Sequence, residues 1–474
     1  MLSLFLLVPL ATVLLLNLPF FTVPRKLVLG ICCLLSLAQA VVAPALPGLL
    51  AAFPGDPIAA LLHGTFAVDA VSIVVLLSIG IIAFMALLIA ETALKEEKDF
   101  PIFANLLLVS LVGMNGMVLV TDLFTLYIFL EITSLSSFIL IGFKKTEESL
   151  EGAFKYLLLS AVASIMILTA IALLMLLAGG TSFAAVRTAF DANASSGLAR
   201  VCLGLLAAGF CVKSGLIPFH GWVPDAYSSA PSPTSVLLAG IVTKTGGMYV
   251  LIRLVISVFG FRWPLQPILI GVGLLSMIPG AFAALGQRDM KRLLAWSSIS
   301  QMGYIILGLA CGSPLGLAGA LFHLFNHAVF KSLLFTNAAA VEEKTGTRDI
   351  RLLGGLAEQM PVTGTTSVIG LLSASGVPPF AGFWSKLLII IALWQSGWQP
   401  VAVAAVLTSI VTLGYLLSLQ RSVFFGKRRD ESALVTEAGP GITVPSVLLA
   451  VLAVTAGLFL PYLLSLLGIT GWLP

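Results

Sequence analysis

The chain has 474 residues, of which 59% are hydrophobic and 10% are charged. Soluble domains carry about 25% charged residues, so this composition excludes an ordinary soluble enzyme and indicates a protein that folds in lipid. The net charge of +4 does not point to nucleic acid, because the basic residues follow the loops of a membrane topology.

Apolar segments that can cross a bilayer recur from one end of the chain to the other, at about 20 residues for each transmembrane helix. We therefore predict an all-α membrane protein of about fourteen transmembrane helices that forms a single domain over residues 1–474. The segment 362–396 is too long for one straight helix, and we expect it to be broken. In chain order, the predicted spans are 2–21, 27–47, 71–91, 102–121, 123–143, 154–178, 198–218, 232–258, 265–286, 293–312, 315–341, 362–396, 401–424 and 444–468.

The basic residues predict the orientation of these spans. No basic residue precedes the first apolar segment, and Arg25 and Lys26 follow it, which is not the pattern of a cleaved signal peptide and places the N-terminus outside. Alternation from there puts 17 of the 25 Lys and Arg residues in the loops of one side, 4 on the other side and 4 inside the membrane. We therefore predict a multi-pass protein of the cell inner (plasma) membrane with basic cytoplasmic loops and both termini outside.

The five cysteines lie in or beside apolar helices, without the spacing of a metal or haem site. A role as small buried hydrophobes is favoured over redox work. The chain also has no dinucleotide fingerprint and no phosphate loop. We expect no cofactor in this chain and assign any redox chemistry to partner subunits.

One short motif occurs twice, as GLIPFHG at 215–221 and as GVPPFAG at 376–382. The copies are about 160 residues, or five predicted spans, apart. An odd number of spans reverses the direction of the chain, as in transporters built from inverted repeats with broken helices. We predict two inverted five-helix repeats, at 102–258 and 265–424.

Each copy of the motif should open its helix, because proline removes a backbone donor and glycine tolerates unusual dihedral angles. The residues expected at the breaks are Gly215, Pro218, Pro378 and Pro379. Open backbone at membrane depth survives only where it meets protein or a water-filled cavity. Lys213 lies two residues before the first copy and Lys386 four residues after the second, where hydration is easiest. A proline kink that serves only packing is the alternative.

Charged side chains interrupt the apolar sequence of predicted spans at Glu131, Lys213, Lys244, Lys331 and Lys386. A charge at the bilayer centre costs about 2.5–3.5 kcal/mol on insertion scales, so these groups are expected to face protein or water and indicate an ion or proton path. Glu131 is the natural partner of Lys213, and a lysine that gains and loses such a partner can load and release a proton. A static ion pair that fixes helix register is the alternative.

Lys244 lies among small residues that permit close helix packing, and we expect it to pass protons on from Lys213; snorkelling to an interface is the alternative. His323, His327 and Lys331 are spaced by four residues and form one stripe of a helix. Histidine titrates near neutral pH and suits a proton relay. A zinc site, which lacks a third ligand, and polarity that serves packing are the alternatives. Lys386 would complete the path near an exit.

A polar loop is predicted between Pro218 and Pro233, on the cytoplasmic side. His220 and Asp225 in this loop are candidates for proton entry, and a proline-rich cap ordered by hydrogen bonds is the equal alternative. At the outer helix edges, Asp69 and Asp122 are expected to be caps or solvated ends.

These segments also carry a family resemblance. The stretch KSGLIPFHGWVPDA at 213–226, with APSPTS at 230–235, resembles the antiporter-like subunits of respiratory complex I, of multisubunit sodium/proton (Mrp-type) antiporters and of group 4 membrane-bound hydrogenases. The fifth-helix glutamate, the QMGY sequence at 301–304, the histidine–lysine helix and the segment 378–386 follow in the family's order, so the resemblance covers nearly the whole chain.

The resemblance implies that Glu131 and Lys213 gate proton movement. It also implies half-channels and a central hydrophilic axis, formed by Lys244, Lys386, His323, His327 and Lys331. The lysine at the twelfth-helix position, Lys386, differs from the glutamate of the middle complex I member.

The implied function is that of a non-catalytic, proton-translocating subunit of a redox-driven complex, either a complex I-like NADH:quinone oxidoreductase or a membrane-bound hydrogenase. The alternatives are a subunit of a sodium/proton antiporter without redox chemistry, and a structural subunit that no longer conducts. Other membrane subunits and lipid are the expected partners, and protons or sodium are the expected ions.

Overall fold

The computed structural model of the chain describes residues 1–18, 23–52, 66–94, 96, 98–193, 196–261, 265–427 and 435–459. Within these ranges the chain is helical, with three isolated β-bridges between loops and no strand. The all-α prediction is therefore confirmed.

Twelve helices of the described ranges are long and apolar enough to cross a membrane, so the predicted count of fourteen is not confirmed. They are α2 (Arg25–Ala52), α4 (Ala70–Ala93), α5 (Asp99–Leu119), α6 with η1 (Leu123–Lys144), α7 (Glu147–Ala178), α9 (Gly197–Ser214), the helix from α11 to η4 (Ser232–Phe259), α13 (Leu265–Leu285), α14 (Met290–Ala310), α15 (Pro314–Thr345), α18 with η5 (Gln399–Phe425) and α19 (Pro440–Leu458). Shorter helices are α1 (Leu4–Leu16), α8 (Phe183–Asn193), α10 (Trp222–Ser229), α16 (Pro361–Ser375) and α17 (Ala381–Gln395).

The difference from fourteen arises at the first predicted span and at the span 362–396. The first predicted span, 2–21, holds only the short helix α1, and its last residues, 19–21, lie outside the described ranges. Residues 460–468 of the last predicted span also lie outside them, as do Lys95, Arg262, Arg428 and Arg429 of the charge count. The span 362–396 is divided into α16 and α17, so its predicted break is confirmed.

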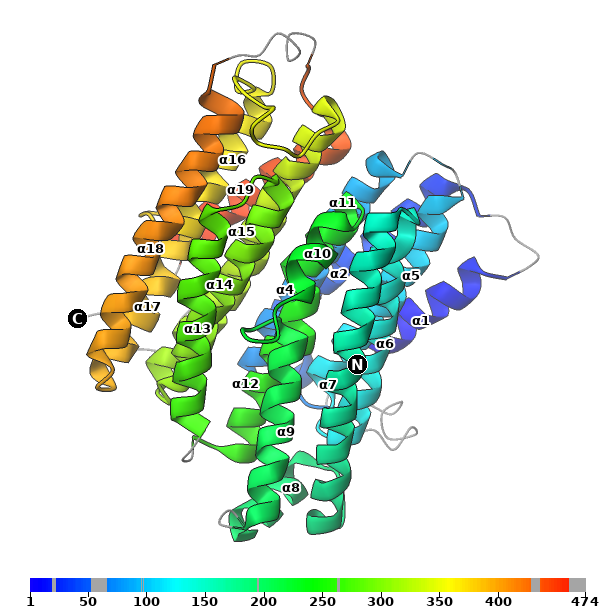
Figure 1. Cartoon of the computed structure of the whole chain (residues 1–474). Helices are drawn as coiled ribbons and strands as arrows, with labels where there is room; N and C mark the ends of the chain where they lie inside the picture. The colour runs from blue at the N-terminus through cyan, green and yellow to red at the C-terminus, as the bar shows by residue number, and fades with distance from the viewer. Residues whose placement is uncertain are drawn as a thin grey trace.

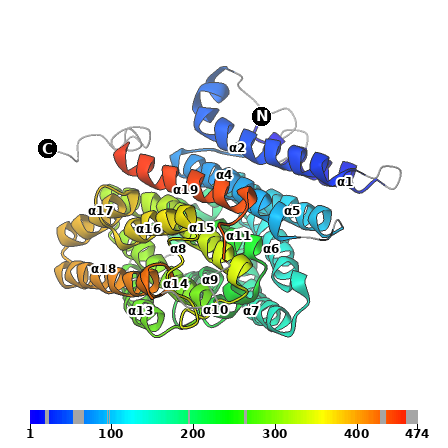
Figure 2. The same ribbon diagram turned by 90° about the horizontal axis from the view of Figure 1, so that it is seen from above.

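The helices run roughly parallel in one bundle, with the first half of the chain and the second half side by side (Figure 1). The halves meet where α10, α11 and the π-helical turn η2 (Leu238–Val242) pack against α14 and α15. Seen from above, α1 and α2 lie at the outer edge of the bundle, and α19 lies on the same side (Figure 2). The helices α14 and α15 are almost completely buried over their most apolar stretches, and His323, His327 and Lys331 of α15 lie in the interior.

Both copies of the repeated motif adopt the same local backbone. Helix α9 ends at Ser214 and α16 ends at Ser375, and each is followed by a glycine with positive φ, 67° at Gly215 and 81° at Gly376. Each copy also contains a cis peptide bond before a proline, Ile217–Pro218 and Pro378–Pro379. This likeness agrees with the motif, while the inverted repeats at 102–258 and 265–424 stay a prediction.

The segment predicted as a polar loop between Pro218 and Pro233 contains the helix α10 instead, so that prediction is wrong in part. Trp222, Val223, Ala226 and Tyr227 are buried at helical spacing, and α10 packs against α7 and α14. The indole of Trp222 donates to the Val212 carbonyl at 3.1 Å. The apolar spacing outweighs the prolines and serines, and α10 continues the bundle beyond the break after α9.

We call the end of the bundle at which α7 begins and α15 ends the basic end. It holds Lys144, Lys145, Lys291, Arg292, Lys344 and Arg348. Arg348 ties this end together through ion pairs to Glu148 at 3.3 Å and to Asp289 at 3.1 Å. At the other end, Asp69 and Asp122 cap α4 and α6, as predicted, by accepting from the backbone N–H of Ser72 and Thr125.

Candidate functional site

The first cluster joins the glutamate and the lysine that the sequence pairs. Lys213 lies in the last turn of α9, directly before the break, and its Nζ is 3.4 Å from Glu131 Oε1. The same amine donates to Ser134 Oγ at 2.8 Å and to Ser160 Oγ at 2.6 Å. Ser164 donates to the same Glu131 oxygen at 2.5 Å. The amine is therefore solvated by hydroxyl groups as well as by its carboxylate.

The two members of this pair differ in exposure. The Lys213 side chain is 5% exposed and the Glu131 side chain is 29% exposed, on the α6–α7 side of the bundle. The exposed carboxylate can change its surroundings more easily than the buried amine. The ion pair between them can therefore open by movement of the Glu131 side chain.

Lys244 lies in the centre of the helix from α11 to η4 and is fully buried. This helix contains π-helical turns at Leu238–Val242 and Lys244–Tyr249, and such turns are rare in proteins and frequently lie at functional sites. The Lys244 amine donates to the Ala239 carbonyl of its own helix and lies 3.5 Å from Thr243 Oγ1. In the described part of the chain no carboxylate lies within ion-pair distance of it.

Helix α15 places the other three predicted groups in the interior. The Lys331 amine donates to the Leu294 carbonyl at 3.0 Å and to the Ser297 hydroxyl, both on α14. His323 lies between Ser385 Oγ, 2.8 Å from Nδ1, and Gln301 Oε1, 3.1 Å from Nε2. All of these side chains are buried.

His327 differs from His323 and Lys331 in its hydrogen bonding. Both of its ring nitrogens are buried, and neither has a hydrogen-bond partner in the described part of the protein. Its ring lies 6.3 Å from the ring of His323 and 5.2 Å from that of Phe330. Buried polar groups are nearly always hydrogen-bonded, so this imidazole is available to a mobile proton carrier.

Lys386 lies in α17, just after the second break, and is 3% exposed. Its amine donates to the carbonyls of Ala374 at 2.9 Å and Ser375 at 3.4 Å, at the end of the half-helix α16. It also lies 4.8 Å from the centre of the Tyr304 ring. The negative end of the α16 dipole and the ring face stabilise a cation here without a carboxylate.

Polar side chains for which no role was predicted contact some of these groups. Ser297 touches Lys331, Gln301 touches His323, and Ser385 touches His323 next to Lys386. The α14 residues are four apart and so lie on one face of that helix. Gln301 belongs to the QMGY motif, and its spacing from Ser297 is the signal that could have identified this face.

The structure does not support Asp225 as a free proton acceptor. Asp225 is held by Lys155, whose Nζ is 2.6 Å from Oδ2, and by Arg292, which donates to Oδ1. It lines a charged cavity of about 460 Å³ at the basic end. His220 packs on the Trp296 ring at 4.9 Å, and its Nδ1 is buried with no partner in the described residues.

A second buried ion pair was missed from the sequence. Lys291 Nζ lies 2.5 Å from Glu342 Oε2, and the Lys291 side chain is 0% exposed while that of Glu342 is 24% exposed. Lys291 was counted with the basic cytoplasmic loops. Its burial depends on α15, which supplies Glu342 from a distant part of the chain.

At the opposite end, Arg253 forms a two-pronged ion pair with Asp69, at 2.5 and 2.8 Å. Burial alone would raise the pKa of the Asp69 carboxyl, but hydrogen bonds from Arg253 and Ser72 outweigh it and lower the pKa to about 2. Arg253 also donates from Nε to the Tyr249 hydroxyl at 3.1 Å. This pair lies near the end of the helix that carries Lys244.

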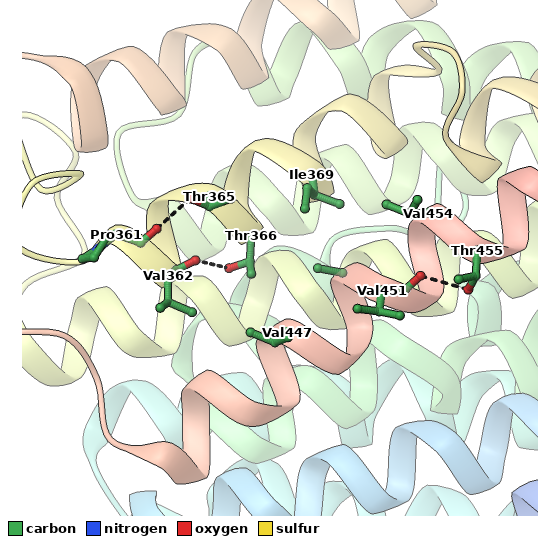
Figure 3. Close-up of a pocket in the computed structure, with 10 residues that line it drawn as sticks. Pro361, Val362, Thr365, Thr366, Ile369, Val447, Val451, Val454 and Thr455 are labelled. Atoms are coloured by element: carbon green, nitrogen blue, oxygen red, sulfur yellow. Dashed lines mark hydrogen bonds between the residues drawn. The ribbon is translucent and has the colours of Figure 1, made fainter.

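A groove of about 560 Å³ lies between α16 and α19 and is separate from the charged groups (Figure 3). Its lining consists of apolar side chains and threonines, including Ile369, Val451 and Thr365. It has no ionisable lining residue, so it does not belong to the candidate path. The described residues also contain no group of three or more His, Cys, Asp or Glu side chains placed to hold a metal ion.

Comparisons with known proteins agree with this architecture. A family model described as NADH:quinone oxidoreductase/Mrp antiporter, TM, matches residues 120–412. NADH-quinone oxidoreductase subunit N of Desulforudis audaxviator is 32% identical over 386 residues, which cover 78% of this chain and 77% of that protein. A component of the Na(+)/H(+) antiporter of Alkalihalophilus pseudofirmus is 35% identical over 392 residues, which cover 77% of this chain and 48% of that protein.

The fold also matches a solved membrane complex. A chain of the membrane-bound sulfane sulfur reductase, an archaeal respiratory membrane complex, superposes with a TM-score of 0.85 and 27% identity over 99% of this chain and 96% of that chain. That chain is part of a respiratory membrane complex. The fold described above therefore also occurs in a chain of such a complex.

Proposed function

Since the chain belongs to the family of membrane subunits shared by NADH:quinone oxidoreductase and Mrp antiporters, we propose that it moves protons along its buried row of ionisable side chains. It is an antiporter-like membrane subunit of the complex I or Mrp type. The proposed row comprises Glu131, Lys213, Lys244, Lys331, His327, His323 and Lys386.

One observation carries the proposal. The amines of Lys244, Lys331 and Lys386 lie against backbone carbonyls and hydroxyl groups instead of a carboxylate each. A buried charge with a purely structural role is normally paired with an opposite charge. Carbonyls and hydroxyls accept a hydrogen bond from a charged or a neutral amine alike. Such surroundings suit groups that alternate between the two states.

Glu131 would control the start of the row. While its carboxylate is near, the Lys213 ammonium is stabilised by Coulomb attraction in a medium of low dielectric constant. When the carboxylate turns away, the charged amine keeps only Ser134 and Ser160 as partners, and its proton is free to move on. Glu131 is the more exposed partner, which supports its role as the movable one.

The next step would lead from Lys213 to Lys244. The helices that carry Lys213 and Lys244 approach closely beside these residues. A Cβ atom on Gly247 would lie only 2.6 Å from Ser214 Cα. The Ser214 hydroxyl is buried with no hydrogen-bond partner in the described residues and is available for transfer. From Lys244 the proton would reach the centre of the bundle.

In the second half, like charges would drive the proton forward. His327 experiences the charges of Lys244, Lys331 and Lys386, so these groups repel each other's protonated forms. Arrival of a proton at one amine then favours its release from the next. Ser297, Gln301 and Ser385 would carry the proton from Lys331 through His323 to Lys386.

We assign the basic end to the cytoplasm of the cell inner membrane and both termini to the outer side, following the excess of Lys and Arg at that end. The driving partner would be a redox module of a complex I-like or hydrogenase-like assembly, and this chain itself would hold no cofactor. The identity of 35% to a component of an Na(+)/H(+) antiporter supports sodium/proton exchange without redox chemistry as the second candidate.

The test uses the assembled complex in everted membrane vesicles, with a pH-sensitive dye as reporter. Glu131→Gln and Lys213→Ala should each lower the proton-pumping rate roughly 100-fold while the complex still assembles. Lys98→Ala is the matched control, because Lys98 is 78% exposed and forms an ion pair with the exposed Glu96 at the surface. Pumping at the parental rate in both variants would defeat the proposal. Proton movement driven by an imposed sodium gradient, without an electron donor, would favour the second candidate.

A further inference from the structure

The polar stripe of α15 continues beyond the residues that the sequence identified. Glu342 follows Lys331 by eleven residues, which is three turns of an α-helix at about 3.6 residues per turn. Glu342 therefore lies on the same side of α15 as His323, His327 and Lys331. It is the member of the stripe nearest the basic end.

Glu342 belongs to a triangle of side chains that contact one another, with Lys291 and Ser232 as the other two members. Its Oε2 lies 2.5 Å from Lys291 Nζ on α14. The Ser232 hydroxyl, at the start of α11, accepts from Lys291 at 3.1 Å and donates to Glu342 at 3.3 Å. The triangle thus joins the helix that carries Lys331 to the helix that carries Lys244.

The exposure of this pair has the same asymmetry as that of Glu131 and Lys213. The carboxylate side chain is 24% exposed, while the amine is completely buried. Lys144 and Arg348 are the further charged groups whose fields reach Glu342, and both are basic. A proton from the aqueous side would meet the Glu342 carboxylate before the buried Lys291.

Helix α14 leads inward from this pair. Lys291 precedes Leu294 by three residues, so the two lie on neighbouring turns of one side of the helix. The Leu294 carbonyl and the Ser297 hydroxyl are the two groups that accept from Lys331. The pair therefore lies one to two turns of α14 closer to the basic end than the groups that accept from the Lys331 amine.

We propose that Glu342 and Lys291 form the intake site through which protons enter the buried row from the basic end. The inference rests on the proposed proton-translocating function. Glu342 takes a proton from the aqueous side and its ion pair with Lys291 opens. The Lys291 ammonium then passes its own proton inward to Lys331 and is reprotonated by Glu342, so one proton is taken up and one reaches Lys331.

Asp225 is the competing intake residue, and its contacts argue against it. It is held by two cations, Lys155 and Arg292, which line the charged cavity with it. Within the described ranges, its carboxylate pairs with α7 and α14, and not with α11 or α15, the helices that lead to Lys244 and Lys331. Its role is to fasten α10 to α7 and α14.

The experiment compares Glu342→Gln, Glu342→Asp and Asp225→Asn in the assembled complex, with Glu131→Gln as reference. Glu342→Gln should lower the pumping rate roughly tenfold, whereas Glu342→Asp and Asp225→Asn should keep most of it. Azide or formate, at concentrations too low to collapse the gradient of the unaltered complex, should restore pumping in Glu342→Gln. A small weak acid can replace a missing proton carrier, but it cannot replace a missing structural ion pair.

The outcomes separate the two proposals. If Glu131→Gln stops pumping and Glu342→Gln does not, the intake site is refuted and the proposed function stands. If Glu342→Gln is slow and weak acids do not restore it, the pair is structural and the inference is overturned. If Glu131→Gln pumps at the parental rate, the proposed function itself fails. The double variant Lys291→Gln/Glu342→Gln, which removes both charges, replaces Glu342→Gln if that variant fails to assemble. It should pump as slowly as Glu342→Gln, because the relay residue is lost as well, and pumping at the parental rate would overturn the inference, because removal of both partners of a structural pair is close to neutral.

Discussion

The two broken helices share a backbone motif, but different groups stabilise their lysines. Lys213 comes before its break and is stabilised by a carboxylate and two serine hydroxyls. Lys386 comes after its break and is stabilised by the last carbonyls of α16 and by the face of Tyr304. The first amine has a partner that can leave, and the second is held by fixed dipoles.

Because of this difference, one motif can serve the two ends of the proposed proton path in different ways. A mobile carboxylate allows a switch, because its departure changes the electrostatic free energy of the neighbouring ammonium. Fixed backbone dipoles provide a site of constant strength, which suits a residue whose charge depends on the amines before it. The comparison therefore predicts that loss of a charged side chain lowers stability at the first site and does not lower it at the second.

The largest expected effect is on stability at the first break. Glu131→Ala leaves the buried Lys213 amine without its counter-ion and should lower the free energy of unfolding by about 3 kcal/mol. Lys386→Met removes a buried amine that has no carboxylate partner among the described residues, and it should leave stability unchanged or slightly raised, although proton transfer stops. Thermal unfolding of the purified complex measures both. Equal losses in the two variants would show that the sites are alike.

A slightly smaller effect is expected at the last glycine of each motif copy. A Cβ atom on Gly382 would collide with the Ser373 carbonyl oxygen, whereas a Cβ atom on Gly221 would have nothing within 4 Å. Gly382→Ala should therefore cost up to about 3 kcal/mol, the upper part of the range for overpacking, because backbone has to move. Gly221→Ala is the matched control and should be close to neutral. A tolerant Gly382→Ala variant would contradict the close approach of α16 and α17.

How far the sequence predicted the site depends on whether partners lie in recognisable motifs. Glu131 and Lys213 were paired correctly because both interrupt apolar helices, and the break in 362–396 followed from its length and prolines. The prolines and serines of 219–233 concealed α10, whose apolar spacing was the better signal. The functions of these residues stay predictions.

Long-range pairing explains what the sequence did not reveal. Lys291 looks like a loop residue because it lies among Arg288 and Arg292, and only the packing of α14 on α15 brings it to Glu342. Asp225 looks like a free acid because its two cations come from α7 and α14. In both cases the charge pattern was visible, but the depth and the partner were set by tertiary contacts.

The first glycine of each copy provides the next test of the comparison. Gly215 and Gly376 both have positive φ, so alanine at either position should cost about 1–2 kcal/mol of unfolding free energy. The consequences for pumping should differ. A Cβ atom on Gly376 would lie 3.0 Å from Lys386 Cδ, whereas one on Gly215 would press on Val223. Gly376→Ala should slow pumping more than Gly215→Ala, and the reverse order would contradict a role for Lys386.

The smallest effect is expected at Asp69 and Arg253, which close the end of the bundle opposite the proposed intake. Burial opposes ionisation of Asp69, but hydrogen bonds from Arg253 and Ser72 outweigh it and lower the pKa of Asp69 to about 2, from an unfolded value of 3.8. The stabilisation is therefore fully present above pH 3.8 and is lost as the pH falls toward 2.

Asp69→Asn keeps the cap of α4, because asparagine also accepts from the Ser72 N–H, and removes only the charge. The Asp69 side chain is 49% exposed, so the loss should be no more than about 1 kcal/mol. Thermal midpoints of the complex at pH 5, 6.5 and 8 should show the same small difference between the two proteins, with pumping unchanged. A difference that grows or shrinks across this range, or a pumping defect, would mean that the Asp69 pair titrates with the path and is not a fixed structural contact.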